Sequence, residues 1–379
     1  MFAYSIKDSV IDVVGALGFE EDNDGWITPR RLPDWTISQF ADGAIDRFSK
    51  FPSGVRLRFT TSADEITLKV RVSRLVITGI ADQVRPAAFD LLIDGVESQT
   101  QHAENGNILR LTATAPSVFV ETLEVGEIDN LKFSGLGTAS KVIEIWLPTS
   151  GIVEIAEVSA TSEIIAAPAD TRKRWLHYGS SISQCIEADR PMDAWALRAA
   201  QLLNLNITNF GLAGQCQLDG FVARSMAALP ADVITLKLGI NIVNADSMRE
   251  RAFIPAVHNF LDILRESAPH TPIIIISAIW CPFHEETPGP TMIDGANLFG
   301  KERPEEFAAG ALTLQRTREL LEEVVAKRAD KNIHFMDGLT LFGASDEGSL
   351  PDKLHPNSAG YRLMADRFAK AQRAFIESL

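Results

Sequence analysis

The chain has 379 residues, of which 46% are hydrophobic and 23% charged, so it can form two folded domains and is too apolar to be disordered. Its formal net charge of −14 repels phosphate backbones and anionic lipid, so we expect neither a nucleic-acid nor a membrane partner. The three cysteines, Cys185, Cys216 and Cys281, are far apart in sequence and suggest neither a disulfide framework nor a thiolate metal site.

The first fifteen residues carry an isolated lysine and acidic residues where a signal peptide needs a basic region and a long apolar run. No stretch of about 18 apolar residues follows. We therefore expect a cytoplasmic protein.

The first half of the chain shows the period-two alternation of strands with one buried face, most cleanly in residues 66–72. Asp94 and Gly95 predict a tight hairpin turn. Residues 8–17 could form a short helix, but there is no convincing helical run between Pro29 and Ala160. The sequence therefore predicts an antiparallel β-sandwich or jelly roll. The other predicted strands are 55–59, 89–93, 108–114, 117–123, 130–133, 141–147 and 152–158.

A small-residue, proline-containing connector at 166–170 marks the predicted domain boundary, with an accessory domain at 1–168 and a second domain at 169–379. Before it, Trp26 and Trp35 could stack on sugars, although plugging the end of the sandwich is favoured.

After the connector, short apolar runs alternate with longer amphipathic ones. Five buried strands with interleaved helices predict a parallel, three-layer α/β/α sheet, and its active site should lie at the carboxyl ends of the strands. The predicted strands are 173–179, 206–210, 233–238, 273–279 and 332–336, and the predicted helices are 194–203, 218–229, 249–267, 304–327 and 358–379.

Polar motifs follow the ends of these strands. Ser181 comes after the first, Gly214 after the second and Asn241 after the third, while Asp352 and His355 lie near the C-terminus. A nucleophilic serine needs a base, a group that orients the base, and donors aimed at the oxyanion. We therefore expect His355 to be the base and Asp352 its partner. The expected oxyanion donors are the N–H groups of Ser181 and Gly214 and the amide of Asn241.

The motif order Gly-x-Ser, Asn-x-Gly-x-x-Gly, Gly-x-Asn and Asp-x-x-His resembles the SGNH (also called GDSL) hydrolase superfamily over about residues 172–379. The resemblance implies a flavodoxin-like α/β fold and the same catalytic roles. The all-β N-terminal domain is similar to that of two-domain members, among them carbohydrate acetylesterases and some acyltransferases. Ser180 and Ile242 depart from the family pattern, which often has Asp there, so we expect altered loop hydrogen bonding and substrate choice with catalysis retained.

Three further features have alternative interpretations. His177 is more typical of a satisfied core histidine than of a second base. The run His284-Glu285-Glu286 favours a solvated lid over a metal site, because no matching ligand pair is nearby. The loop 281–303 is expected to shape the acyl or alcohol pocket, and Trp280 is the best single candidate for lining it, with simple packing as the equally favoured alternative.

The sequence thus predicts a serine esterase that removes a short acyl group, such as acetyl, from an alcohol such as a sugar, through an acyl-enzyme and without metal or cofactor. An acyltransferase with the same site is the first alternative. A non-catalytic sugar-binding protein is the second. The expected partner is a small-molecule or saccharide ester, and the oligomeric state is left open.

Overall fold

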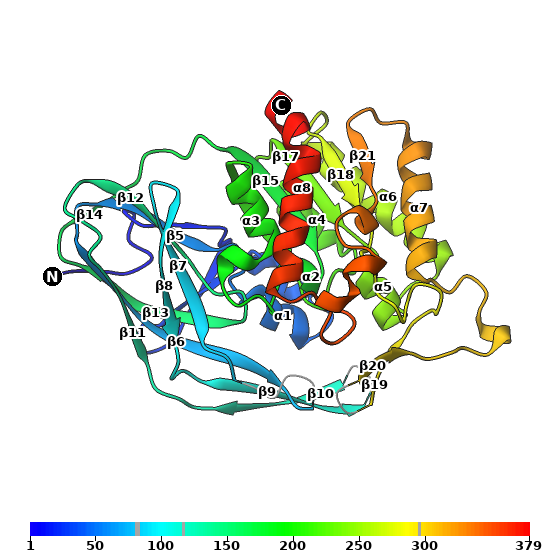
Figure 1. Ribbon diagram of the computed structural model, residues 1–379, viewed down its shortest axis with the longest axis horizontal. Helices are drawn as coiled ribbons and strands as arrows, with labels where there is room; N and C mark the ends of the chain where they lie inside the picture. Colours follow the sequence, from blue (N-terminus) through cyan, green and yellow to red (C-terminus); the bar gives the residue numbers. More distant parts are fainter. Residues whose placement is uncertain (80–83, 116–117, 295–296) are drawn as a thin grey trace. The chain divides into compact units, whose positions relative to one another are not determined.

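A computed structural model describes residues 1–79, 84–115, 118–294 and 297–379 (Figure 1). Its contacts divide the chain into two units. The first comprises Met1–Thr171 and Ala188–Asp193, and the second comprises Arg172–Glu187 and Ala194–Leu379. The short segment Ala188–Asp193 thus groups with the first unit, although it lies beyond the connector in sequence.

The first unit consists of two β-sheets that share one hydrophobic core. Alternate residues of β6 (Glu65–Ile77), among them Leu68 and Val70, point into this core together with Phe59 and Ile143 of the other sheet. The first sheet contains β1 (Phe2–Tyr4), β3 (Gly18–Glu21), β4 (Ile27–Arg30), β6, β9 (Ile108–Ala115), β10 (Val118–Glu124), β11 (Asp129–Ser134) and β13 (Gly151–Ala160). The second contains β2 (Asp12–Val14), β5 (Arg56–Thr61), β7 (Ala87–Ile93), β8 (Val96–Ala103), β12 (Lys141–Trp146) and β14 (Ile164–Ile165).

Several predictions for this unit are confirmed and others are wrong. Asp94 and Gly95 both have positive φ and join β7 to β8, as the hairpin motif predicts. The possible helix at 8–17 is instead turn and strand β2, and the helix α1 (Gly43–Ser49) was not predicted. Strands β6 and β9 pair in parallel, in contrast to the expected antiparallel pattern. Ser117, the predicted start of one strand, lies outside the described residues.

The second unit is built on a five-stranded parallel sheet with the order β16-β15-β17-β18-β21, as the alternation of apolar runs and amphipathic helices predicts. Its strands are β15 (Lys173–Gly179), β16 (Leu205–Gly211), β17 (Val233–Lys237), β18 (Ile273–Ile276) and β21 (Ile333–Met336). Its α-helices are α2 (Ser181–Gln184), α3 (Trp195–Leu202), α4 (Gly220–Ala227), α5 (Ile240–Ala245), α6 (Glu250–Ser267), α7 (Leu314–Arg328) and α8 (Ser358–Ser378) (Figure 1).

Side chains of β15, the second strand of this sheet, pack against helices on both faces of the sheet. On one face, Trp175 stacks on Phe368 of α8, with 5.3 Å between ring centroids, and lies edge-on to Trp195 of α3. On the other face, Tyr178 stacks on Phe260 of α6 at 4.9 Å. Trp175 and Tyr178 are three positions apart and therefore face opposite sides of the sheet, where they contact the helices of both outer layers.

Two segments of this unit differ from the prediction. The helix expected at 304–327 begins only at Leu314, because the Thr313 side chain accepts a hydrogen bond from the Arg316 N–H and caps the helix there. The loop at 281–303 contains a hairpin of β19 (Thr291–Asp294) and β20 (Asn297–Gly300), with residues 295 and 296 outside the described part. Among the described residues, no helix is both long and apolar enough to cross a membrane.

Candidate active site

The candidate site lies where the strand order of the parallel sheet reverses. Strand β15 is first in the chain but lies between β16 and β17. Ser181 follows β15, Gly214 follows β16 and Asn241 follows β17, so three of the predicted residues come from neighbouring loops at this switch point. Ligands of open α/β sheets bind at such points, outside the carboxyl ends of the strands.

Ser181 is the first residue of the short helix α2, directly after β15. Ser180 caps this helix, and its hydroxyl accepts a hydrogen bond from the Ile182 N–H. Ser180, the position at which the family pattern has Asp, therefore has a structural role of its own. Ser181 itself is 8% exposed, and its Oγ lies 2.9 Å from Nε2 of His355.

His355 lies between the serine and a carboxylate. Its Nδ1 is 2.7 Å from Oδ2 of Asp352, while the other oxygen, Oδ1, accepts from the backbone N–H groups of Leu354 and His355. Because a carboxylate can only accept, Nδ1 carries the proton, which leaves Nε2 of the neutral ring to accept the Ser181 hydroxyl. Burial raises the pKa of Asp352, but its bonds to His355 outweigh this and lower it to about 2.

A second carboxylate also lies close to this imidazole. Oε1 of Glu187 is 3.7 Å from Nδ1 of His355, and Oε2 of Glu187 accepts a 2.7 Å hydrogen bond from the hydroxyl of Tyr361 in α8. Burial disfavours the imidazolium, but Glu187 and Asp352 outweigh this and raise the pKa of His355 to about 9. Neither Glu187 nor Tyr361 belongs to a sequence motif, so neither was predicted.

Three hydrogen bonds join β16 and the loop after it to β15 and α2. The Leu212 N–H donates to the Gly179 carbonyl, the Ala213 N–H to the Gln184 side chain, and the Asn209 amide to the Ser183 carbonyl. Gly214 follows, with φ of +69° and open space around it, so glycine suits this backbone conformation. This loop therefore has a fixed place beside Ser181.

Asn241, in the first turn of α5, is 2% exposed. Its Oδ1 accepts the N–H of Cys216 at 3.0 Å, and its carbonyl accepts from the Gln217 side chain. With Oδ1 used in this way, the amide group at Nδ2 is the end of the side chain that can donate to a ligand.

His177 is a buried structural histidine, as the sequence favours. Its Nδ1 lies 2.6 Å from Oγ1 of Thr235 and its Nε2 lies 2.8 Å from Oγ of Ser183. Burial, together with the positive charge of Lys237, lowers the pKa of His177 to about 3. The neutral ring hydrogen-bonds through both nitrogens and thereby links α2, through Ser183, to β17, through Thr235.

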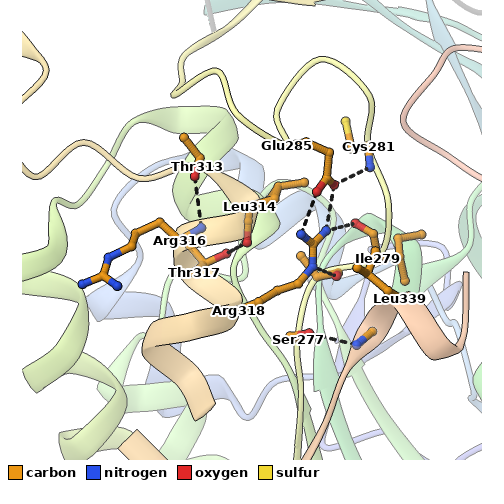
Figure 2. Close-up of polar contacts among 12 residues, drawn as sticks. Ser277, Ile279, Cys281, Glu285, Thr313, Leu314, Arg316, Thr317, Arg318 and Leu339 are labelled. Atoms are coloured by element: carbon orange, nitrogen blue, oxygen red, sulfur yellow. Dashed lines mark hydrogen bonds and ion pairs between the residues drawn. The ribbon is translucent and has the colours of Figure 1, made fainter. Parts of the chain in front are cut away.

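The prediction of a solvated lid at His284-Glu285-Glu286 is wrong for the first two residues. His284 is fully buried and hydrogen-bonds through both ring nitrogens to Thr287 and Thr291. Glu285 forms a bidentate ion pair with Arg318 of α7, with both N–O distances at 2.7 Å (Figure 2). Within the described residues, no group of three or more His, Cys, Asp and Glu side chains could hold a metal ion.

Arg318 also holds the chain directly after β18. It donates to the carbonyls of Ala278 and Ile279, while Glu285 accepts the Cys281 N–H (Figure 2). Trp280, within this segment, donates its indole N–H to Glu347 at 3.0 Å. The start of the loop at 281–303 is thus fixed by buried charge, and its role in a pocket stays a prediction.

The two tryptophans of the first unit differ in environment. The ring of Trp26 faces the guanidinium of Arg71 at 4.8 Å, and Lys69 lies 5.8 Å from its centroid. Trp35 is 48% exposed, so it does not plug the sandwich.

Solved structures with the same architecture span the whole chain. A salicylyl-acyltransferase from a tetracycline biosynthetic pathway is 24% identical, with a TM-score of 0.78 over 99% of this chain and 97% of its own. A family two carbohydrate esterase from Cellvibrio japonicus is 14% identical, with a TM-score of 0.57 over 99% and 98%. An acetyl xylan esterase from the rumen bacterium Butyrivibrio proteoclasticus is 12% identical, with a TM-score of 0.54 over 100% of both chains. At these identities the likeness shows the fold.

Sequence comparison identifies the second unit more directly. Residues 177–363 match the GDSL-like lipase/acylhydrolase family, and this range contains every predicted site residue. No curated protein matches the chain in sequence. The fold is therefore that of the SGNH hydrolases, with an additional many-stranded β domain at the N-terminus. The second unit of this chain belongs to the GDSL-like lipase/acylhydrolase family.

Proposed function

We propose that the protein is a serine esterase that hydrolyses short-chain acyl esters, such as the acetyl esters of a carbohydrate. The observation that carries this proposal is the continuous chain from Ser181 Oγ through the imidazole of His355 to the carboxylate of Asp352, with steps of 2.9 and 2.7 Å. A nucleophile, a base and a group that orients the base are the minimum that acyl transfer to serine requires.

In the proposed reaction, Ser181 Oγ attacks the ester carbonyl while His355 Nε2 accepts the hydroxyl proton. The negative charge on the carbonyl oxygen is stabilised by the N–H groups of Ser181 and Gly214 and by the Asn241 amide. His355 then gives its proton to the leaving alcohol, which leaves an acyl group on Ser181. Water, deprotonated by His355, hydrolyses this intermediate and restores the enzyme.

The acetyl group and the sugar are supported by the architecture that the chain shares with carbohydrate esterases. The proposed partner is accordingly a small-molecule or saccharide ester. We propose Trp280, which follows strand β18, as a substrate contact.

Turnover of p-nitrophenyl esters of increasing chain length, alongside acetylated sugars, tests this function. Ser181→Ala should lose at least about 10³-fold in rate, because its hydroxyl forms the acyl bond. The matched control is Ser183→Ala on the same helix, whose hydroxyl contacts His177, and it should keep most of its turnover. An unchanged rate in Ser181→Ala would refute the esterase and leave a sugar-binding protein as the better description.

An acyltransferase is the second candidate, favoured by the similarity of the whole chain to the salicylyl-acyltransferase. The same acyl-enzyme would then pass its acyl group to an alcohol in place of water. Ester turnover that saturates with added alcohol, with the acylated alcohol as product and less free acid, would favour transfer. Free acid as the sole product at every alcohol concentration would favour hydrolysis.

A further inference from the structure

The base His355 has two acidic neighbours that contact it differently. Asp352 hydrogen-bonds to Nδ1 at 2.7 Å, whereas Oε1 of Glu187 lies 3.7 Å from the same atom, beyond hydrogen-bond distance. Glu187 therefore acts on the ring chiefly through its charge. Because the interaction is not a hydrogen bond, Glu187 can be neutralised without removing the partner that sets the tautomer.

Tyr361 holds the Glu187 carboxylate in place. Its hydroxyl donates to Oε2 at 2.7 Å from a fully buried position in the long helix α8. Burial raises the pKa of Tyr361 well above its usual value, so the phenol stays protonated and remains a donor. The Glu187 side chain is 30% exposed, and its attraction for the imidazolium is therefore screened by solvent only in part.

Buried Lys237 brings a positive charge near Cys185, at the edge of this pair. Asp352 and Glu187 are the charged groups that act on the ring, and Ser181 contributes a neutral hydroxyl. Cys185, at the end of α2, borders Tyr361, and burial raises the pKa of its thiol well above the usual value, so it is neutral too. The electrostatic environment of His355 is thus set by two carboxylates.

We propose that Glu187, anchored by Tyr361, is a positioning residue that stabilises the His355 imidazolium during acyl transfer, an inference that rests on the proposed esterase function and deepens it. Asp352 fixes the tautomer and orientation of the ring, while Glu187 adds negative charge beside it. The two carboxylates therefore have separable roles.

A stronger base has opposite effects on the rate at high and low pH. Where the ring is neutral, greater basicity favours proton removal from Ser181, but at low pH it keeps more of the ring protonated and inactive. Removing the Glu187 charge should therefore slow the enzyme on its high-pH plateau and speed it on the acidic side.

The test is Glu187→Gln, which keeps the length of the side chain and an oxygen that can accept from Tyr361. The acidic limb of kcat/KM should move down by about one pH unit, as expected for loss of an opposite charge within ~4–6 Å. The plateau should fall severalfold, so that the profiles of variant and parent cross. Profiles that differ only by a constant factor would indicate a structural role and overturn the proposal.

A second measurement does not depend on activity. In a Ser181→Ala background, the His355 imidazole is titrated by NMR with and without Glu187→Gln, and its signal is assigned by its loss in His355→Asn. A lowered pKa in the variant supports the role of Glu187 even if no esterase activity is found. An unchanged pKa overturns it even if the protein is an esterase.

If Glu187→Gln does not fold, Tyr361→Phe serves instead. It leaves the carboxylate but removes its anchor, so the pKa of His355 should fall by less than in Glu187→Gln and in the same direction. No shift on removal of the anchor would overturn the proposal.

Discussion

At the residue scale, His355 combines burial, which disfavours its charged form, with two adjacent carboxylates that favour it. Their balance raises its pKa to about 9. A base must be neutral to accept the Ser181 proton, so lowering the pH below this value removes active enzyme. The value of kcat/KM for a non-ionising ester should therefore rise through neutral pH toward about pH 9. A plateau already reached near the ordinary histidine value of 6.5 would contradict this electrostatic account.

Asn241 gives a second prediction at this scale. The Cys216 N–H holds Oδ1 of Asn241, which leaves Nδ2 to donate to the substrate. We expect the Nδ2 hydrogen bond to the oxyanion of the transition state to be stronger than its hydrogen bond to the ground-state carbonyl. Asn241→Ala should lower kcat by about 10²–10³-fold with a much smaller change in KM. Asn244→Ala, one turn further along α5, is the matched control and should keep its kcat. A change in KM alone would mean that Asn241 does not contact the oxyanion.

Sequence motifs could place Ser181, Asp352 and His355 together because Ser181 directly follows a strand and the other two have the Asp-x-x-His spacing. Glu187 and Tyr361 could not be found in this way. They are 174 residues apart, and they meet only because α8 packs back against the sheet. A contact that arises from helix packing has no local sequence motif, so it becomes visible only in the structure.

At the element scale, strand β17 carries a buried lysine at its end. Lys237 is 1% exposed, and its Nζ has no hydrogen-bond partner within the described parts of the chain. Burial lowers its pKa to about 8 from 10.5. Burying a polar group without a partner is unfavourable, so we expect Lys237 to lower the free energy of unfolding of the protein.

Lys237→Met should therefore stabilise the protein by about 1–3 kcal/mol at neutral pH, as measured by urea unfolding. Between pH 8 and 10.5 the unfolded parent carries a proton that the folded parent lacks, so parent stability should rise with pH across this window. The variant should lose this rise. If Lys237→Met were instead less stable at pH 7, the ammonium must have a favourable partner.

At the element scale, hydrophobic periodicity does not predict where a helix begins or how a loop is held. Residues 304–313 continue a helix-like composition, but the helix begins after the Thr313 cap. In the same region, Glu285 looks like a surface residue until Arg318 of α7 is seen to bind it (Figure 2). Period and composition do not reveal which loop charge meets a partner on a distant helix.

At the scale of the whole molecule, the change from a period of two to helical spacing at residues 166–170 predicts an all-β part followed by an α/β part. It cannot predict that Ala188–Asp193 belongs with the first unit. That segment is held there by the buried carboxylate of Asp90, which accepts from Arg190 at 3.0 Å and from the Met192 N–H at 2.9 Å. Such a long-range anchor leaves no periodic signal in the sequence.

We propose that Ser181, activated by His355, forms a covalent acyl bond. Labelling the whole protein with a fluorophosphonate, followed by peptide mass spectrometry, tests it most directly, because the reagent reacts with an activated serine. We expect one adduct, on the peptide containing Ser181, that is retained in Ser183→Ala, strongly slowed in His355→Asn and absent in Ser181→Ala. No adduct, or equal labelling in Ser181→Ala, would contradict it.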